Sequence, residues 1–138
     1  MSKSAGEADC IYLAEPADSL NKKIMRAKTD SGPVTPGEQP SQAVQNLLDL
    51  MQLVCSEEVC SHYRHAYQEG SIRYGDMKKQ LAEDMEQFIA PWRAKISDIL
   101  ANDALLARTA AMGAEKARAS AAATLSEVRN VIGFRKFY

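Results

Sequence analysis

The sequence predicts an all-α fold, a bundle of about five helices preceded by a short extended arm. From residue 41 onward, apolar side chains recur at intervals of three and four residues, as on one face of a helix. Serine, asparagine and glycine interrupt this pattern where helices are expected to begin and end. Strand-forming residues gather in only one short run, at residues 10–13.

Length and charge narrow the class of protein. The chain has 138 residues, enough for one domain with a real core. Its formal net charge of −1 argues against a general nucleic-acid-coating protein, which would be strongly basic. No apolar run reaches the roughly 20 residues of a membrane span, and the polar start shows no signal peptide. The cysteines number three, so we expect free thiols in a reducing compartment.

The first 41 residues contain one short apolar run, one helix and one loop. Residues 10–13, Cys-Ile-Tyr-Leu, are too few to make a sheet. They are expected to form a strand that pairs with something outside the chain, or to pack as an extended arm. Pro16 suits a first helical position, and a helix over 16–28 places Leu20 and Ile24 on one side. Residues 30–41 carry three prolines and two glycines, which predicts a loop.

Two shorter helices follow the loop. Ser41 is a good N-cap for a helix whose apolar face comprises Val44, Leu47, Leu48, Met51, Val54 and Cys55. Ser56 restarts a helix that runs to about Gln68, and Gly70 stops it.

The longest apolar pattern begins at Tyr74. Its stripe of helical period comprises Met77, Leu81, Met85, Phe88, Ile89, Trp92, Ile96, Ile99 and Leu100. Pro91 removes one backbone hydrogen bond and should kink this helix. Asn102 and Asp103 mark a break and a cap, and a last helix is expected over 104–131, ended by Gly133. Small residues four apart would let another helix approach it closely. In a bundle of five helices, we expect the two long helices to be antiparallel.

A cluster of cysteine and histidine invites a zinc hypothesis. Cys55, Cys60, His62 and His65 lie within eleven residues, but their spacing fits no usual zinc pattern. A buried cysteine beside two exposed histidines is the favoured interpretation, and we expect no metal site. No catalytic arrangement of serine or cysteine with histidine is visible either. Trp92 could stack on a base, although a tryptophan that covers a core is commoner.

Basic residues form local clusters. Lys22, Lys23, Arg26 and Lys28 lie close together, Lys78 and Lys79 open the long helix, and Arg135 and Lys136 close the chain. They are either a solvated face or phosphate contacts that position an RNA without reading its sequence. The start of the chain, Met1-Ser2-Lys3-Ser4, offers an ammonium group and two hydroxyls to a phosphate, but such a start is also typical of a disordered terminus.

Several motifs, in order along the chain, resemble the C-terminal part of tryptophanyl-tRNA synthetases of bacterial or organellar type. Residues 1–4 match the last four residues of the K-M-S-K-S signature of class I synthetases. Further matches are Lys23-Ile24 with Ala27-Lys28-Thr29-Asp30, Asn46-Leu47-Leu48, Tyr74-Gly75-Asp76-Met77-Lys78, Pro91, Gly113 to Arg118, and Val131 to Phe134.

The resemblance implies an ATP-dependent tryptophan–tRNA ligase. It makes Lys3 the second signature lysine, a catalytic residue that contacts the triphosphate, with Ser2 and Ser4 as supporting donors to the ATP phosphates. The lysines of that loop stabilise charge on the phosphates during attack on the α-phosphorus. The resemblance also implies Mg²⁺ with ATP in the full enzyme, tRNA(Trp) as partner, a homodimer, no membrane, and a cytoplasmic or organellar location.

The resemblance divides the chain into residues 1–30 (signature loop, short strand and linking helix), a loop at 31–40, and a helical domain of anticodon-binding type at 41–138. The first signature lysine and the nucleotide-binding α/β domain are missing, so this chain alone is not expected to bind ATP or to catalyse. It would act with that missing domain or with a separate chain that carries it. Two alternatives stay open: a stand-alone helical RNA-binding or interaction module, and a structural bundle that dimerises through the alanine and glycine face of 110–121.

Overall fold

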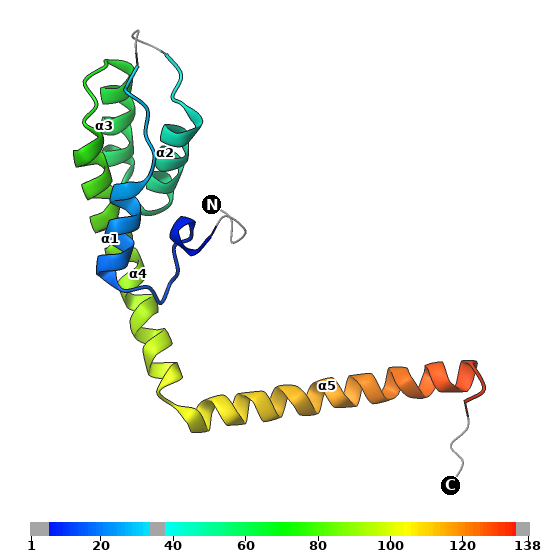
Figure 1. The fold of residues 1–138 in the computed structure, drawn as a ribbon. Coiled ribbons are helices and arrows are strands. Elements are labelled where there is room, and N and C mark those ends of the chain that lie inside the picture. The colour runs from blue at the N-terminus through cyan, green and yellow to red at the C-terminus, as the bar shows by residue number, and fades with distance from the viewer. Residues whose placement is uncertain (1–5, 34–37, 135–138) are drawn as a thin grey trace. The chain divides into compact units, whose positions relative to one another are not determined.

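The computed structural model describes residues 6–33 and 38–134, in which helices are joined by turns and loops (Figure 1). A 3₁₀ turn, η2, precedes five α-helices, and neither range contains a strand, so the predicted all-α class is confirmed. The elements are η2 (Glu7–Asp9), α1 (Ala17–Arg26), α2 (Gln42–Val54), α3 (Glu57–Gln68), α4 (Tyr74–Leu100) and α5 (Asp103–Val131). The chain divides into two compact units, residues 1–95 and 96–138. The predicted domain boundaries at residues 30 and 40 stay predictions.

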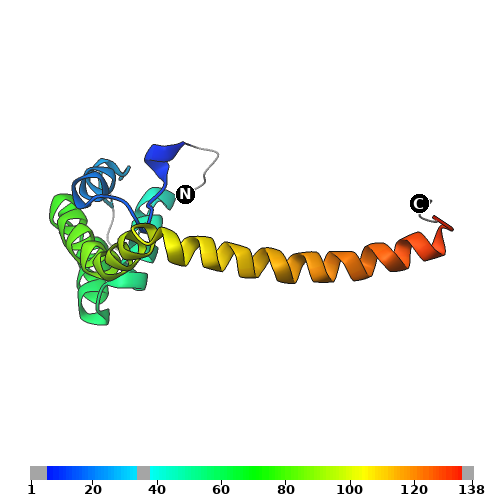
Figure 2. The same cartoon turned by 90° about the horizontal axis from the view of Figure 1, so that it is seen from below.

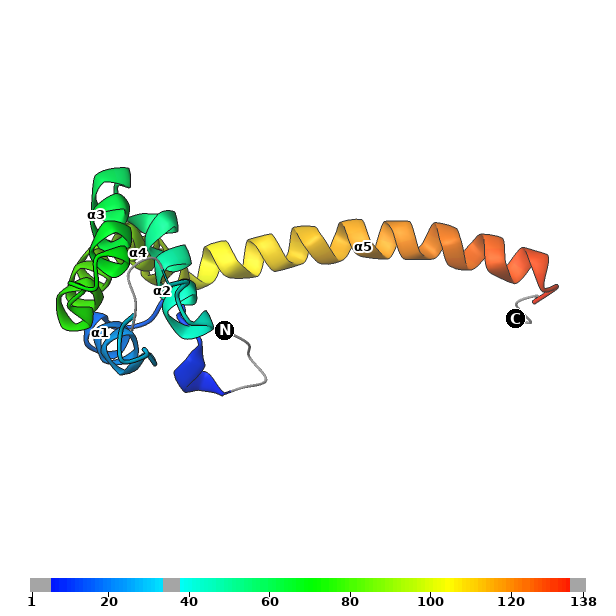
Figure 3. The ribbon, with the colours of Figure 1, turned by 90° about the horizontal axis from the view of Figure 1, so that it is seen from above.

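The first unit has a continuous apolar core to which α1, α2, α3 and the first part of α4 all contribute, and these helices lie around one another in Figure 2 and Figure 3. Its fully buried members include Leu20 of α1, Met51 of α2 and Met77, Leu81 and Ile89 of α4. These are the positions that helical periodicity predicts for the inner faces. Because all four helices share this core, the unit has a hydrophobic interior of its own.

Residues 10–13 form no strand among the described residues, and a strand that pairs with something outside the chain stays a prediction. The chain makes the 3₁₀ turn η2, leaves it extended at Cys10, and turns again where the Glu15 N–H donates to the Tyr12 carbonyl at 3.1 Å. The Cys10 carbonyl accepts a hydrogen bond at 2.7 Å from Lys23 of α1. Pro16, the predicted first helical position, is instead the N-cap of α1, so the helix begins one residue later, at Ala17.

The predicted caps and stops of α2, α3 and α5 are confirmed, whereas α1 ends at Arg26, two residues before the predicted end. The hydroxyls of Ser41 and Ser56 each accept a hydrogen bond at 3.4 Å, from the N–H groups of Val44 and Val59. The side chain of Asn102 accepts at 2.9 Å from the N–H of Leu105 at the start of α5. Gly70 follows α3 and Gly133 follows α5, both with positive φ, the conformation that glycine adopts most readily beyond a helix end.

The apolar stripe of α4 is buried only in its first half. Met77, Leu81, Met85 and Ile89 are buried, whereas about half the surface of Phe88 and Trp92 is exposed. The expectation that Trp92 covers the core of its unit is therefore wrong, and Lys95 lies over its ring instead. The helix continues through Pro91.

In the second unit, α5 is one long helix with a bound cap at its start. None of its described residues is buried within the chain. The antiparallel pairing of the long helices and the dimer through 110–121 stay predictions. In the part of the chain that the structure describes, no helix combines the length and apolar character needed to cross a membrane.

Candidate functional site

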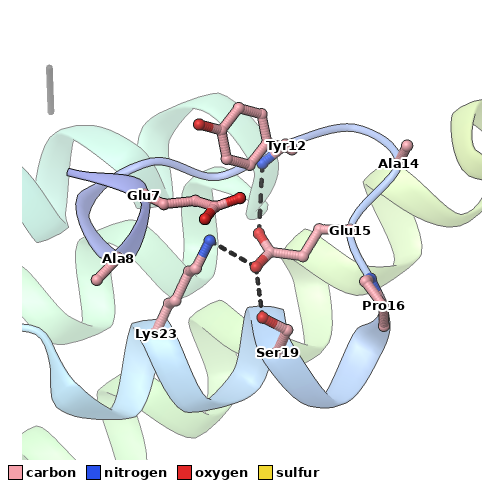
Figure 4. Close-up of a pocket in the computed structure, with 8 residues that line it drawn as sticks. All are labelled: Glu7, Ala8, Tyr12, Ala14, Glu15, Pro16, Ser19 and Lys23. Atoms are coloured by element: carbon pink, nitrogen blue, oxygen red, sulfur yellow. Dashed lines mark hydrogen bonds and ion pairs between the residues drawn. The ribbon is translucent and has the colours of Figure 1, made fainter. Parts of the chain in front are cut away.

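The predicted signature residues Ser2, Lys3 and Ser4 lie outside the described residues. A pocket of about 580 Å³ lies where the chain that follows them meets α1 (Figure 4). Its walls come from η2, from the segment between η2 and α1, and from the exposed turns of α1. The lining residues are Glu7, Ala8, Tyr12, Ala14, Glu15, Pro16, Ser19 and Lys23.

The carboxylate of Glu15 lines the pocket and accepts bonds from three donors. Glu15 is only 7% exposed, which is unusual for a charged residue. Its Oε1 accepts a hydrogen bond from Ser19 Oγ at 2.5 Å and lies 2.6 Å from Lys23 Nζ, while Oε2 accepts from the Tyr12 N–H at 3.3 Å. Figure 4 shows the three donors converging on this one group. The carboxylate therefore joins the arm before α1 to the first two turns of that helix.

Lys23 binds two acceptors at once. Its Nζ donates to the Cys10 carbonyl at 2.7 Å and forms the ion pair with Glu15. The same ammonium lies 5.2 Å from the centre of the Tyr12 ring, a distance at which a cation and an aromatic face attract each other. One side chain of α1 thus contacts the main chain, a carboxylate and a ring of the preceding segment.

The bonds to Glu15 change its titration. Burial alone would raise the pKa of this carboxyl, but the hydrogen bonds from Lys23, Ser19 and the Tyr12 N–H outweigh burial and lower the pKa below its ordinary value. Glu15 is therefore a stable anion at neutral pH. A group held this way is suited to fixing structure and is poorly suited to general acid–base catalysis, which needs a pKa near the working pH.

A second ion pair lies on α4. Both terminal nitrogens of Arg93 donate to the Glu86 carboxylate at 2.7 Å, in the two-pronged geometry that arginine favours. These bonds raise the pKa of Arg93 against the effect of burial, and the charges of Glu86 and Glu15 raise it further.

Sequence reasoning missed Glu15 and Ser19, although a signal was present. Glu15, Ser19 and Lys23 are spaced four residues apart, which places them along one face where a helix begins. In the sequence, Lys23 belongs to a basic cluster and to a motif of the family resemblance, and neither predicts an ion pair. Glu15, the acidic residue just before Pro16, indicates that the basic cluster lies next to a carboxylate with which Lys23 can form an ion pair.

The contacts at the other end of α1 correct the assignment of Lys78. This residue was expected to be a candidate RNA contact at a helix end, but it is only 9% exposed, and its Nζ donates to the Ala27 carbonyl at 2.7 Å. It therefore satisfies a carbonyl at the end of α1. Lys79, Arg26 and Lys28 are exposed beside this contact.

The cysteines and histidines are placed as the favoured interpretation predicts. Cys60 is buried, Cys55 is half-buried, and both His62 and His65 are exposed. Among residues 6–33 and 38–134, no group of three histidine, cysteine, aspartate or glutamate side chains is arranged to hold a metal ion.

Comparison with known proteins shows the family to which the sequence belongs. The sequence pattern of the family described as "tRNA synthetases class I (W and Y)" matches residues 1–90. A tryptophan–tRNA ligase of Porphyromonas gingivalis is 49% identical over 135 residues, which cover 98% of this chain and 41% of that protein. The corresponding enzyme of Helicobacter pylori is 34% identical, covering 96% and 40%. That of Streptococcus pyogenes is 31% identical, covering 99% and 41%.

The chain therefore spans about two fifths of the length of the curated relatives that it matches. The family pattern ends within α4, whereas the similarity to the relatives also takes in α5. On the pattern match over residues 1–90, the chain belongs to the class I tRNA synthetases of the tryptophan and tyrosine group.

Proposed function

We propose that this chain is the C-terminal part of a tryptophan–tRNA ligase, which charges tRNA(Trp) with tryptophan at the expense of ATP. The observation that carries the proposal is the 49% identity to the P. gingivalis tryptophan–tRNA ligase over 98% of the chain. The family description covers tryptophan and tyrosine enzymes alike, so this relative is what favours tryptophan. The proposal places the protein in the cytoplasm or in an organelle.

In this function Lys3 contacts the triphosphate of ATP, and Ser2 and Ser4 supply neutral donors to the same phosphates. An ammonium group placed where negative charge develops lowers the barrier to attack on phosphorus. ATP and Mg²⁺ would be held together with the part of the enzyme that the relatives have beyond this chain. Residues 1–138 alone are therefore expected to be catalytically inactive.

The exposed cations around the Ala27–Lys78 contact are the candidates for contacts to tRNA. The hydrogen bond from Lys78 to Ala27 brings the end of α1 beside the start of α4. Arg26 and Lys28 flank Ala27, Lys79 follows Lys78, and all three are exposed without an ion pair to a described residue. Such groups can bind RNA phosphates without reading sequence. We call Arg26, Lys28 and Lys79 the basic surface.

The test is a hybrid enzyme. Residues 1–138 are joined to the part of the P. gingivalis ligase that they do not match, and tryptophan-dependent exchange of pyrophosphate into ATP is measured. The hybrid should exchange and should charge tRNA(Trp), whereas Lys3→Ala in the hybrid should lower exchange about 100-fold, a typical effect of losing one group that stabilises transition-state charge. A folded hybrid without tryptophan-dependent exchange would contradict the proposal.

A stand-alone RNA-binding module is the second candidate. It is favoured by the first unit, which has its own apolar core and carries the basic surface. Binding of tRNA(Trp) by residues 1–138, measured at several salt concentrations, distinguishes the two. Salt-sensitive binding that prefers this tRNA, together with an inactive hybrid, would support the module.

A further inference from the structure

The segment that leads from the signature to α1, residues 6–16, has few main-chain bonds to the rest of the protein. We call it the linking segment. Apart from the Pro16 carbonyl, which accepts from the N–H groups of Ser19 and Leu20 where α1 begins, its backbone hydrogen bonds among described residues run within the segment itself. They join Asp9 to Gly6, Cys10 to Glu7 and Glu15 to Tyr12. Tyr12 and Leu13 are largely exposed, and Ile11 is the residue that packs against the core. Its attachment therefore depends on side chains.

Lys23 makes most of that attachment. Its Nζ binds the Cys10 carbonyl at 2.7 Å and the Glu15 carboxylate at 2.6 Å, so it contacts the linking segment at two points, five residues apart. Glu15 in turn binds the Tyr12 N–H and the hydroxyl of Ser19. The lysine is mostly shielded, with 18% of its side chain exposed, so water competes weakly for these bonds.

We propose that Lys23 is a positioning residue for Lys3, because it fixes the linking segment from which the signature extends. The inference rests on the proposed function. Lys3 precedes Cys10 by seven residues, a length of chain that reaches at most about 25 Å when extended. Fixing Cys10 limits the volume that the Lys3 ammonium can occupy. A displacement of about 1 Å at a catalytic group can cost 100-fold in rate, so the position of Cys10, from which the chain leads back to Lys3, matters.

The ammonium group suits this task. It is a compact cation with three donors on a flexible stem, and its partners here lie in three directions: a carbonyl, a carboxylate and a ring face. Methionine at this position keeps a long apolar stem and removes every one of these interactions. Arginine keeps the cation and part of the bonding, so Lys23→Arg is the conservative variant.

The first test uses residues 1–138 as they are. Hydrogen exchange is followed in a peptide that covers residues 6–16. Lys23→Met should speed exchange in this peptide several-fold while peptides from α2 and α3 keep the parental rates. Lys22→Met, at the exposed neighbouring lysine, is the matched control and should leave the peptide unchanged. Parental exchange at residues 6–16 in Lys23→Met would overturn the inference, because the segment would then be held by other contacts.

The second test uses the hybrid ligase and separates positioning from folding. Lys23→Met should raise the KM for ATP about tenfold and leave the KM for tryptophan unchanged, and Lys23→Arg should restore most of the loss. Partial unfolding would lower the amount of active enzyme without changing either KM. Lys95→Met, at an exposed lysine of α4, should keep the parental constants.

A double-mutant cycle completes the experiment. If Lys23 acts through Lys3, then Lys23→Met should have little further effect on the KM for ATP in a hybrid that already carries Lys3→Ala. Fully additive effects of the two substitutions, or an unchanged KM for ATP in Lys23→Met, would overturn this inference. If the parental hybrid is active in that case, the proposed function still holds. An inactive parental hybrid would overturn the proposed function and this inference together.

Discussion

The hydroxyl of Tyr74, at the start of α4, donates a hydrogen bond to Oδ1 of Asp30, which lies 44 residues earlier in the chain. The same Oδ1 accepts from the Gly32 N–H at 2.9 Å. Burial would raise the pKa of Asp30, but the bonds from Ser41, Tyr74 and Gly32 lower it overall, so this carboxylate is held as an anion. Asp30 thus fixes the start of the loop between α1 and α2 against α4.

Removal of the Tyr74 hydroxyl should destabilise the first unit. Tyr74→Phe leaves the Asp30 carboxylate one donor short in a partly buried position, which costs about 1–3 kcal/mol. Urea unfolding followed by circular dichroism measures the change. Tyr63→Phe is the matched control, since no hydrogen bond joins the Tyr63 hydroxyl to a described residue. Equal stability of the two variants would show that the Asp30 bond contributes nothing.

Lys78→Met should be destabilising, although it replaces a charge by an apolar side chain at a buried position. The variant leaves the Ala27 carbonyl without its donor, at a cost of about 1–3 kcal/mol, and methionine packing recovers part of this. Lys79→Met, one residue later and exposed, should change stability by less than about 0.5 kcal/mol. Thermal unfolding of both variants gives the comparison, and a Lys78→Met protein as stable as the parent would contradict the structural role.

Stability should fall in acid partly because of Glu15. Its pKa is lowered on folding, so the stabilisation is complete above the unfolded pKa of about 4.3 and is lost as pH falls through the folded value. Urea unfolding between about pH 6 and pH 3 should therefore show a smaller pH dependence in Glu15→Gln than in the parent. Lys23→Met should flatten the same region, since it removes a donor that lowers this pKa. If the stability of Glu15→Gln depended on pH as steeply as that of the parent, Glu15 would not be a source of the acid sensitivity.

Helix ends and inner faces were predictable because their causes are local. A serine hydroxyl reaches an N–H three residues ahead, so Ser41 and Ser56 identify helix starts from neighbouring residues alone. Likewise the spacing of Leu47, Leu48 and Met51 defines one face whatever packs against it. These features need no knowledge of the rest of the fold.

What sequence reasoning missed depends on partners distant in the chain. A basic residue looks the same in a sequence whether it faces solvent or an inner carbonyl, so Lys78 was assigned to a surface before its contact with Ala27 was visible. In the same way, the hydrogen bond that Lys23 donates to the Cys10 carbonyl, 13 residues earlier, cannot be recognised from the strand-forming side chains of residues 10–13. The roles of Ser2, Lys3 and Ser4 stay predictions from the family resemblance.

The thiol of Cys55 should react unusually slowly with alkylating reagents. Burial, a hydrogen bond to Asp84 and the charge of that carboxylate raise its pKa to about 12. At pH 8 only about one molecule in ten thousand carries the reactive thiolate. Asp84→Asn removes the anionic acceptor, so alkylation of Cys55 by iodoacetamide, followed by peptide mass spectrometry, should become faster. Glu83→Gln, at the exposed neighbouring carboxylate, is the control, and parental alkylation in Asp84→Asn would contradict the assigned cause.

The basic surface should account for part of the salt dependence of tRNA binding. Each phosphate contact releases counterions, so the loss of one cation should reduce the slope of log affinity against log salt by a little under one. Arg26→Ala, Lys28→Ala and Lys79→Ala should each weaken binding of tRNA(Trp) to residues 1–138, and the triple variant should lower the slope by about two to three. Lys116→Ala, at an exposed lysine of α5, is the control for a general change in charge. The slope distinguishes contact from misfolding, because a variant with fewer folded molecules binds less at every salt concentration and keeps the parental slope. If the triple variant kept that slope, the phosphates would be bound elsewhere on the chain.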